Sequence, residues 1–542
     1  MPIKRVAAVF FVLILLFSFL TMRIYLIMSG ADSDLLAFIA SQRELTVPIY
    51  ESRGLIYDKD LKPLVEDTDI IKAVIDPLLV EDKQTVLDAV PPSLQAEAQK
   101  DFEKKRPFSI QINKEFNIKG INCFMVAQRY NAPFNAVHLL GYLDNKGAGA
   151  LGIEKAFDSL LKSDSIKFSA KSYVDGARRT ISGLGMRIEG EYKKKSAGVV
   201  LTIDKQMQKI ADEAADAFIS AGAIVILDTK TGEIRAMSSR PTYNPYNINS
   251  AYNQGEGAFV NRALNPYNVG SAFKIVDTAA YNEGGGDLNV KFYCGGSINV
   301  GTNNIACDKK DGHGTIGIME AFAQSCNVYF IQLAQKAGAQ AILDMAQKMG
   351  FGTETALATG ITSNKGNLPT IKNLSAPAAL ANFAIGQGDF LATPLQVAEV
   401  VSVVAYDGSL RTPYLVKGIC DENMTVSDIN LSKNPVQVIS QNTAQKIREL
   451  MIYTATNGTG FRANPDRGGA GIKTATAQTG IMKNGQLITQ GWIAGFFPSE
   501  NPQYAVAIVA EDAESGSKTA GPAFKYIAEK GYDYIISGRN SQ

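Results

Sequence analysis

The chain is predicted to have an α+β fold, with a β-sheet assembled from two groups of strands that are far apart in sequence. The first group contains "GAIVILD" and "EIRAMSS", preceded by "VVLTID". The second contains "IKTATAQT", "ITQGWIAGFF" and "YAVAIVAE". The long stretch between the groups is mostly helical in pattern. Because strands from both ends need partners, we expect one sheet with helices inserted between its strands.

Amphipathic helices accompany both strand groups. "KQMQKIADEAADAFI" follows "VVLTID", and "GPAFKYIAEKG" lies near the C-terminus. The chain has 542 residues, which allows two or three domains. Its 46% apolar and 20% charged residues are typical of a globular protein. A net charge of +1 lacks the excess of basic residues that is typical of nucleic-acid-binding proteins, so we expect no nucleic-acid partner.

The N-terminus is predicted to cross a membrane once. Lys4 and Arg5 precede an apolar run from Val6 to Met22, and "IYLIM" continues it after Arg23. This length fits a membrane span, and the preceding basic residues favour a cytoplasmic N-terminus. We therefore expect a cytoplasmic tail at 1–5 and an anchor at 6–28. The alternative is a cleaved signal peptide, but its apolar core is usually shorter. In both cases the residues after about 30 lie outside the cytoplasm.

The cysteine and histidine content predicts no metal site and no cofactor. The chain has five cysteines and two histidines, and it contains no C-x-x-C pair. Cys294 and Cys307 bracket a small predicted hairpin. A disulfide between them is possible outside the cell. The odd number of cysteines favours two reduced thiols instead.

Three short motifs carry the candidate chemistry. Ser271 and Lys274 form S-x-x-K at the start of a predicted helix, where free backbone N–H groups favour a developing negative charge. A partly desolvated Lys274 could be neutral and accept the serine proton. S-x-x-K also occurs at Ser159 and at Ser515, so this motif is weak alone. Context favours Ser271, because a polar Ser325-x-Asn327 follows between two apolar helical stretches.

Lys473 begins the third motif, on a predicted strand. A literal K-T-G occurs at Lys230, but it joins two predicted strands and is explained as a hairpin turn. Lys473-Thr474-Ala475 instead follows both other motifs. In a regular strand Lys473, Ala475 and Ala477 share one face. A cation followed by small side chains predicts a surface on which an extended peptide can bind and pair with the strand. We expect unstrained β geometry at Ala475.

These motifs, in this order, resemble the serine transpeptidases of the penicillin-binding protein family. The similarity extends to "NRALNPYNVGSAFKIV", "SCNVYFIQLAQKAG", "AIGQGDFLATPLQVA" and "GWIAGFFPSENPQYAVAIVA". "ESRGLIYDKDLKPL" and "GALGIEKAFDSLL" resemble segments of the class B pedestal. No glycosyltransferase-like segment is recognised, which argues against the bifunctional class A. The resemblance implies an elongated mixed α/β pedestal, of dimerisation type, at 29–200. It also implies a transpeptidase domain at 201–542, with a five-stranded antiparallel sheet flanked by helices and a helical subdomain.

The resemblance also implies the site roles. Ser271 would attack the carbonyl between the two D-alanines of a peptidoglycan stem peptide, with Lys274 as general base. Ser325 would relay the proton to the leaving amine. The other expected roles are substrate binding by Asn327, electrostatic tuning by Lys473, carboxylate binding by Thr474 and Thr476 beside Ala475, and an oxyanion hole from the N–H groups of Ser271 and Thr476.

Further expectations concern inhibitors and partners. β-Lactams would leave a stable ester on Ser271, and a SEDS-type glycosyltransferase would be the membrane partner. Two departures from the family stand out, namely alanine at 475, where family members carry glycine, and Cys326 inside the S-x-N motif, which we interpret as a small buried side chain. The alternatives are a β-lactamase or β-lactam sensor that uses the same serine, and a non-catalytic scaffold for a lipid-II polymerase.

Overall fold

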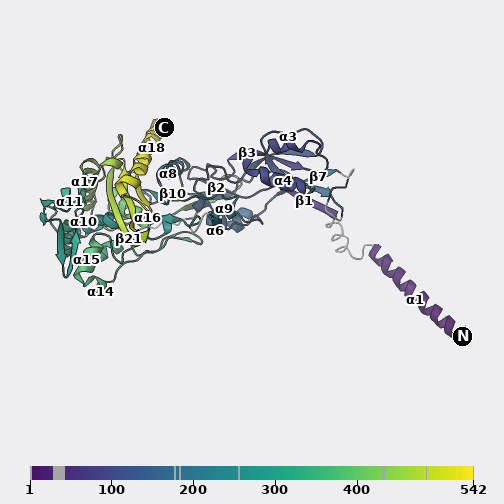
Figure 1. Cartoon of the computed structure of the whole chain (residues 1–542), viewed down its shortest axis with the longest axis horizontal. Helices are drawn as coiled ribbons and strands as arrows, with labels where there is room; N and C mark the ends of the chain where they lie inside the picture. Colours follow the sequence, from purple (N-terminus) through teal and green to yellow (C-terminus); the bar gives the residue numbers. More distant parts are fainter. Residues whose placement is uncertain are drawn as a thin grey trace. The chain divides into compact units, whose positions relative to one another are not determined.

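The computed structural model divides the chain into two compact units (Figure 1). It describes residues 3–28, 43–175, 179–181, 185–253, 257–429, 434–483 and 485–540. The first unit comprises Met1–Arg53, Glu66–Arg129 and Asp164–Lys194, and the second comprises Gly54–Val65, Tyr130–Ser163 and Lys195–Gln542.

The two units are not contiguous in sequence, in contrast with the predicted boundary at residue 200. Residues 54–65 and 130–163, which that boundary assigns to a pedestal, belong to the unit that contains the C-terminal part. β2 (Leu55–Tyr57) illustrates the reason, because it pairs in parallel with β8 (Gly198–Leu201). The functional names given to the domains stay predictions.

The first unit contains the N-terminal helix and two three-stranded sheets. α1 (Ile3–Met28) has 26 residues, or about 39 Å, and it is apolar enough to cross a membrane. It is consistent with a single-pass anchor. The sheets have the orders β1-β6-β7 and β4-β3-β5. The remaining elements are β1 (Glu44–Glu51), β3 (Thr68–Ile75), α3 (Lys83–Asp88), η1 (Pro92–Leu94), α4 (Gln95–Glu103), β4 (Phe108–Ile112), β5 (Ile121–Gln128), β6 (Lys167–Tyr173) and β7 (Met186–Glu189).

The second unit is built on a five-stranded antiparallel sheet, as predicted. Its order is β10-β9-β23-β22-β21, so the N-terminal strand pair and the C-terminal strands meet where β9 pairs with β23. "VVLTID" is the exception among the expected strands, because β8 joins a separate sheet with β2 and β18. The sheet strands are β9 (Gly222–Asp228), β10 (Ile234–Arg240), β21 (Gly471–Lys483), β22 (Gln486–Phe497) and β23 (Tyr504–Ala510).

Both faces of this sheet are covered, which explains why its central strands lack polar alternation. In β9, Val225 and Leu227 pack into one core with α16 (Pro394–Ala405), whose twelve residues are all buried. Ile224 and Ile226 point the other way, into a second core formed with α8 (Lys205–Phe218) and α18 (Gly521–Asn540). The sheet is therefore a rigid central layer from which the site can be presented.

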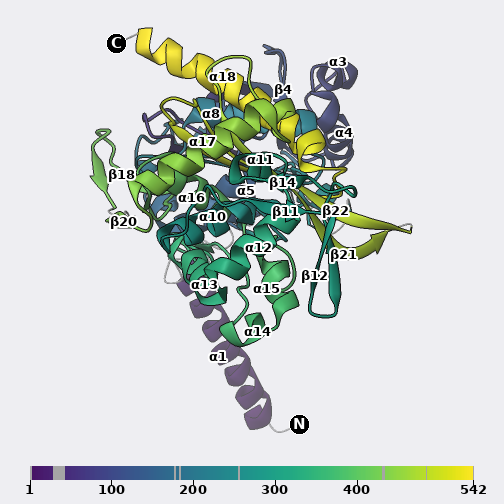
Figure 2. The ribbon, with the colours of Figure 1, turned by 90° about the vertical axis from the view of Figure 1, so that its left-hand side faces the viewer.

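A helical region is inserted between β10 and β21, as expected. Figure 2 shows α10, α12, α13 and α15 gathered in teal and green. The elements of this insertion are α9 (Ile248–Asn253), η2 (Arg262–Leu264), η3 (Gly270–Phe273), α10 (Lys274–Glu283), β11 (Phe292–Cys294), β12 (Ser297–Val300), β13 (Asn303–Ala306), β14 (Gly314–Ile316), α11 (Ile318–Ala323), α12 (Asn327–Ala337), α13 (Ala339–Lys348), β15 (Ala356–Ala358), β16 (Ile361–Thr362), α14 (Ile371–Leu374), α15 (Pro377–Ala384), β17 (Ser409–Leu410), β18 (Val416–Cys420), β19 (Val426–Asp428), β20 (Val436–Gln437), α17 (Gln441–Asn457) and η4 (Phe461–Ala463). Outside it lie α5 (Val137–Leu140), α6 (Gly152–Ala156), α7 (Asp158–Lys162) and η5 (Gly516–Ala520).

Candidate active site

Ser271 lies in the turn that opens a buried helix. η3 contains Ser271, and α10 begins at Lys274, so the S-x-x-K motif spans the junction of a 3-10 turn and an α-helix. Gly270 precedes the serine with φ +62°, a conformation that favours glycine. A Cβ at 270 would also lie 3.3 and 3.4 Å from the methyl groups of Ala477 and Ala475. The small residues of β21 therefore let the Ser271 turn pack against the strand.

Ser325 and Asn327 lie in the short connection between α11 and α12. Ser325 has φ +57°, which is uncommon for a residue with a side chain. The backbone N–H of Ser325 donates to Phe322 O at 3.2 Å, and Asn327 is the first residue of α12. Strained backbone of this kind concentrates at functional sites, where the surrounding structure maintains it.

One hydroxyl joins all three motifs. Ser325 Oγ accepts a hydrogen bond from Lys274 Nζ at 3.2 Å and one from Lys473 Nζ at 2.9 Å. Lys274 Nζ also donates to Ser325 O at 2.6 Å and to Asn327 Oδ1 at 2.8 Å. Within the described part of the chain, no hydrogen bond joins Ser271 Oγ to Lys274 Nζ. Segments that are far apart in sequence thus converge on one buried polar network.

Both lysines are fully buried, and this changes their acidity. Burial, the largest effect, lowers the pKa of Lys274 to about 8, although Asp308 and nearby thiols oppose the change. Burial also lowers the pKa of Lys473 well below its ordinary value, and the adjacent Lys274 lowers it further. Two ammonium groups that share one hydroxyl disfavour each other's charged form. A neutral amine is therefore available beside Ser325 near neutral pH.

The third motif lies on β21, the edge strand of the sheet. Its pairing with β22 is regular from Gly471 to Gln478, and Ala475 has no positive φ, so the expected unstrained geometry at Ala475 is confirmed. Thr474 Oγ1 lies 2.6 Å from Thr459 Oγ1, and Thr476 is exposed. Among the residues that the structure describes, no strand pairs with the outer edge of β21, so that edge can accept an extended peptide.

These groups surround a cavity of about 340 Å³. Its lining includes residues from all three motifs and one carboxylate, that of Asp308. The lining residues are Ser271, Asp308, Ser325, Asn327, Ile385, Gln387, Thr459, Thr474, Ala475, Thr476, Gln478, Thr489, Ser515 and Ser517. Every predicted site residue thus lines the cavity, except Lys274 and Lys473, which lie buried behind Ser325.

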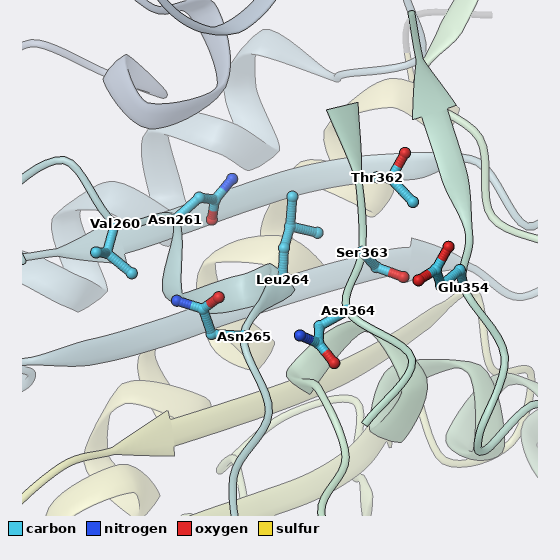
Figure 3. A pocket seen from close by; sticks show the side chains of 8 residues that line it. All are labelled: Val260, Asn261, Leu264, Asn265, Glu354, Thr362, Ser363 and Asn364. Atoms are coloured by element: carbon cyan, nitrogen blue, oxygen red, sulfur yellow. The ribbon is translucent and has the colours of Figure 1, made fainter. Parts of the chain in front are cut away.

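A larger cavity of about 560 Å³ lies elsewhere in the same unit (Figure 3). It is lined mainly by amide and hydroxyl groups that already have local partners. Asn261 accepts from the backbone of Ala263, and Asn364 accepts from that of Gly366. The two buried lysines instead contact Ser325, which lines the smaller cavity together with Ser271.

Residues 222–529, more than half of the chain, match the model of the "Penicillin binding protein transpeptidase domain". The chain belongs to this family. The match confirms the resemblance to class B penicillin-binding D,D-transpeptidases.

The literal K-T-G at 230 forms the predicted hairpin turn between β9 and β10. In this turn the backbone N–H of Gly232 donates to Asp228 O.

Relatives of this transpeptidase include two curated proteins. Stage V sporulation protein D of Bacillus subtilis is 29% identical over 75% of this chain and 64% of its own length, so the match leaves about a third of that relative uncovered. Peptidoglycan D,D-transpeptidase MrdA of Haemophilus influenzae is 24% identical over 92% of this chain and 86% of its own length.

Solved structures share the fold of this transpeptidase. In a complex between penicillin-binding protein PBP2 and MreC from Helicobacter pylori, the matching chain is 22% identical, with a TM-score of 0.64. The match covers 91% of this chain and 99% of that one. At this identity the similarity establishes the fold.

The transpeptidase also contains a cluster that the sequence analysis missed. The ligand atoms of Cys294, Cys307, His313 and Cys326 all lie within 4.8 Å of one another. The sequence analysis assigned no metal-ligating residues, because it searched for C-x-x-C pairs and for several histidines. The available signal was that three of the five cysteines and one of the two histidines lie between residues 294 and 326. Cys294 and Cys307 are free thiols, which agrees with the favoured alternative.

Proposed function

We propose that this protein cross-links peptidoglycan stem peptides through an acyl-enzyme on Ser271. The observation that carries the proposal is the double hydrogen bond to Ser325 Oγ from Lys274 and Lys473, beside the cavity that Ser271 lines. A serine nucleophile, a neutral amine and a hydroxyl relay are the parts that serine acyl transfer requires.

Lys274 removes the proton from Ser271 Oγ while that oxygen attacks the carbonyl carbon between the two terminal D-alanines. The carbonyl oxygen becomes an oxyanion, which the backbone N–H groups of Ser271 and Thr476 stabilise. Collapse of this intermediate breaks the C–N bond. The departing amine of D-alanine takes the proton through Ser325, and the peptidyl ester stays on Ser271.

The second half-reaction reverses these roles. An amine of a neighbouring stem peptide attacks the ester and loses a proton to the network of Lys274 and Ser325. The new amide bond is the cross-link, and Ser271 is regenerated. Lys473 tunes this network electrostatically through its hydrogen bond to Ser325 Oγ, while Asn327 holds the peptide backbone.

The substrate peptide lies along β21 as an additional strand. The free edge of β21 supports this placement, because main-chain hydrogen bonds to an edge strand hold a peptide without regard to its side chains. Thr474 and Thr476, both at the cavity, bind the terminal carboxylate, and Ala475 contributes its small side chain to the same wall.

The anchor and the partners follow from this assignment. α1 holds the protein in the cell membrane with the N-terminus in the cytoplasm and the catalytic unit outside. Residues 29–200 act as a pedestal, except 54–65 and 130–163, which belong to the compact unit that holds Ser271. Residues 29–42, 176–178 and 182–184 lie outside the described residues. A SEDS-type glycosyltransferase in the membrane supplies the glycan strands, and β-lactams acylate Ser271 as substrate mimics.

Labelling with a fluorescent penicillin tests the proposal. The full-length protein in detergent should bind the label covalently, and Ser271→Ala should abolish the labelling. Ser159→Ala is the matched control, because Ser159 opens another S-x-x-K on α7 and should label like the wild type. Covalent labelling of Ser271→Ala at the wild-type level would contradict the assignment of Ser271 as the nucleophile.

The lifetime of the label separates the alternatives. A transpeptidase keeps the ester for hours, whereas a β-lactamase releases it rapidly. Among the described residues that line the cavity, Asp308 carries the carboxylate, and it is the candidate to activate water. Rapid release that disappears in Asp308→Asn would favour a β-lactamase, and a wild type that takes no label would favour the scaffold.

A further inference from the structure

The free edge of β21 presents three residues to a peptide. Ala475 pairs with Trp492 on β22. A Cβ on Gly516 would lie 2.3 Å from the carbonyl oxygens of both residues and 2.9 Å from Trp492 N, so these groups lie together between the two strands. In an antiparallel ladder, residues that bond to the partner strand alternate with residues whose N–H and C=O point away from it. The residues that face the free edge are therefore Thr474, Thr476 and Gln478.

Two of these three residues have carbonyl oxygens that already accept a hydrogen bond. Thr474 O accepts from Lys473 Nζ at 3.0 Å, and Gln478 O accepts from Asn268 Nδ2 at 3.1 Å. Among the residues that the structure describes, none outside the sheet donates to Thr476 O. The carbonyl that remains for main-chain pairing with a peptide is therefore that of Thr476.

The backbone of Asn268 is held by the buried segments around it. Its carbonyl oxygen accepts a hydrogen bond from Trp492 Nε1 at 2.8 Å, and Trp492 is fully buried. The preceding Tyr267 exchanges two backbone hydrogen bonds of 2.9 Å with Ala392, and its ring packs edge-on against the indole of Trp492. The side-chain amide therefore reaches Gln478 O from a rigid backbone, in the segment that leads to Ser271.

Regular pairing of β21 ends directly after this contact. The register of β21 with β22 shifts between Gln478 and Met482, and Gly480 has φ +74°. A peptide that pairs with β21 beyond Thr476 needs Gln478 as its next partner, because residues that face the edge alternate with residues that do not. Asn268 thus occupies the last regular acceptor of the edge.

We propose that Asn268 is a specificity-determining residue that limits main-chain pairing of the stem peptide to Thr476. The inference rests on the proposed function, in which Thr474 binds the terminal carboxylate, so the earlier part of the peptide extends toward Gln478. The residue that carries the scissile carbonyl pairs with Thr476. The residue two positions earlier would pair with Gln478, but its N–H meets the Asn268 amide instead of a free carbonyl. The site therefore selects the end of the peptide and binds the preceding part weakly.

Two thioester probes that differ in length test this assignment with the full-length protein in detergent. N-acetyl-D-alanyl thioglycolate reaches Thr476, whereas N-acetyl-L-alanyl-L-alanyl-D-alanyl thioglycolate extends to Gln478. In both cases Ser271 Oγ takes the acyl group and thioglycolate leaves as the thiol, so the loss of thioester absorbance reports acylation. In Asn268→Ala the ratio of the long-probe to the short-probe second-order rate constant should rise roughly three- to ten-fold, because the long probe gains one neutral hydrogen bond.

Two further variants separate this effect from a general disturbance of the Ser271 segment. Asn268→Ser also removes the donor, because a serine hydroxyl is too short to reach Gln478 O, and it should raise the ratio as Asn268→Ala does. Asn265→Ala is the matched control, since Asn265 belongs to the same segment but lines the other cavity. This control should keep the ratio of the wild type.

Peptide binding without acylation is measured in the Ser271→Ala background. Trp492 is the single tryptophan of the chain and donates to Asn268 O, so its fluorescence reports on this segment. Addition of Asn268→Ala to Ser271→Ala should lower the dissociation constant of N-acetyl-L-alanyl-L-alanyl-D-alanyl-D-alanine roughly three- to ten-fold. The dissociation constant of N-acetyl-D-alanyl-D-alanine should stay the same.

The outcomes distinguish this inference from the proposed function. An unchanged ratio and unchanged long-peptide binding in Asn268→Ala, or equal changes in Asn265→Ala, would overturn the role of Asn268. A lower ratio would also overturn it, because the Asn268 amide would then bind the peptide itself. A wild type that reacts with neither probe, together with tighter long-peptide binding after Asn268→Ala, would contradict the proposed function and leave the role of Asn268 standing.

Discussion

At the scale of single residues, two buried lysines contact the same hydroxyl, and the positive charge of each disfavours protonation of the other. Lys274 and Lys473 both contact Ser325 Oγ, and neither is exposed to water. Desolvation disfavours both ammonium forms, and each positive charge disfavours the other. This arrangement provides a base at neutral pH without histidine, which agrees with a site built from serine and lysine.

The pH dependence of acylation follows from Lys274. Burial lowers its pKa to about 8, and only the neutral amine accepts the proton of Ser271. Acylation should therefore be slow well below pH 8 and should rise with pH through a midpoint near 8. The measurement is the second-order rate constant of penicillin acylation as a function of pH.

Asp308→Asn tests the electrostatic part of this prediction. The groups that favour the Lys274 cation are Asp308, Cys326, Cys307 and Asp277, and the group that opposes it is Lys473. Since the negative charge of Asp308 raises the pKa of Lys274, its removal should move the midpoint to lower pH. A midpoint that stays in place or moves upward would show that Lys274 is not the titrating base.

At the scale of elements, the Ser271 turn depends on the loop after α15. Gly270 N–H donates to Gly386 O at 2.8 Å, and Gly386 has φ +69°. A Cβ at 386 would lie 2.0 Å from Gly270 O, closer than any real contact. The loop and the Ser271 turn therefore fit together only while residue 386 is glycine.

Gly386→Ala should accordingly slow acylation at least about ten-fold, since small displacements of reacting groups are costly. Gly388→Ala is the matched control. Gly388 also has positive φ, but a Cβ there would meet only Asn382 Cβ, at 3.5 Å. The control should lose about 1 kcal/mol of stability with little loss of acylation rate. Equal effects of the two variants on acylation, at similar thermal midpoints, would contradict the proposed contact.

At the scale of the whole molecule, the apolar N-terminal helix and the candidate site belong to different compact units. α1 lies in the first unit, and every residue of the candidate site lies in the second. The side chains of α1 are exposed along the apolar window, as a helix surrounded by lipid requires.

Removal of residues 1–28 should move the protein from the membrane fraction to the soluble fraction and leave the penicillin acylation rate unchanged. The separate location of Ser271 is the reason. Fractionation after an alkaline wash, with the full-length Ser271→Ala variant as a membrane-bound control, measures this. A truncated chain that still sediments with membranes would show that another surface holds it there.

Several features of the fold and the site were predictable because they depend on local pattern. The apolar run of α1, the strands of the central sheet and the order of Ser271, Ser325 and Lys473 follow from residue type and spacing. Ala475 was also predictable, since alanine is unstrained in a regular strand. Local pattern did not reveal that Ala475 and Ala477 face Gly270, because their contact partner is distant in sequence.

By itself, the sequence determined the α+β class, the family and the residues of the three motifs that meet at Ser325. These properties follow from residue type, spacing and the order of short motifs along the chain. Only the tertiary structure decided that 54–65 and 130–163 join the catalytic unit, and that three cysteines and His313 meet beside Ser325. Both are consequences of chain packing, because the residues that meet are distant in sequence and local patterns of residue type do not show their contact.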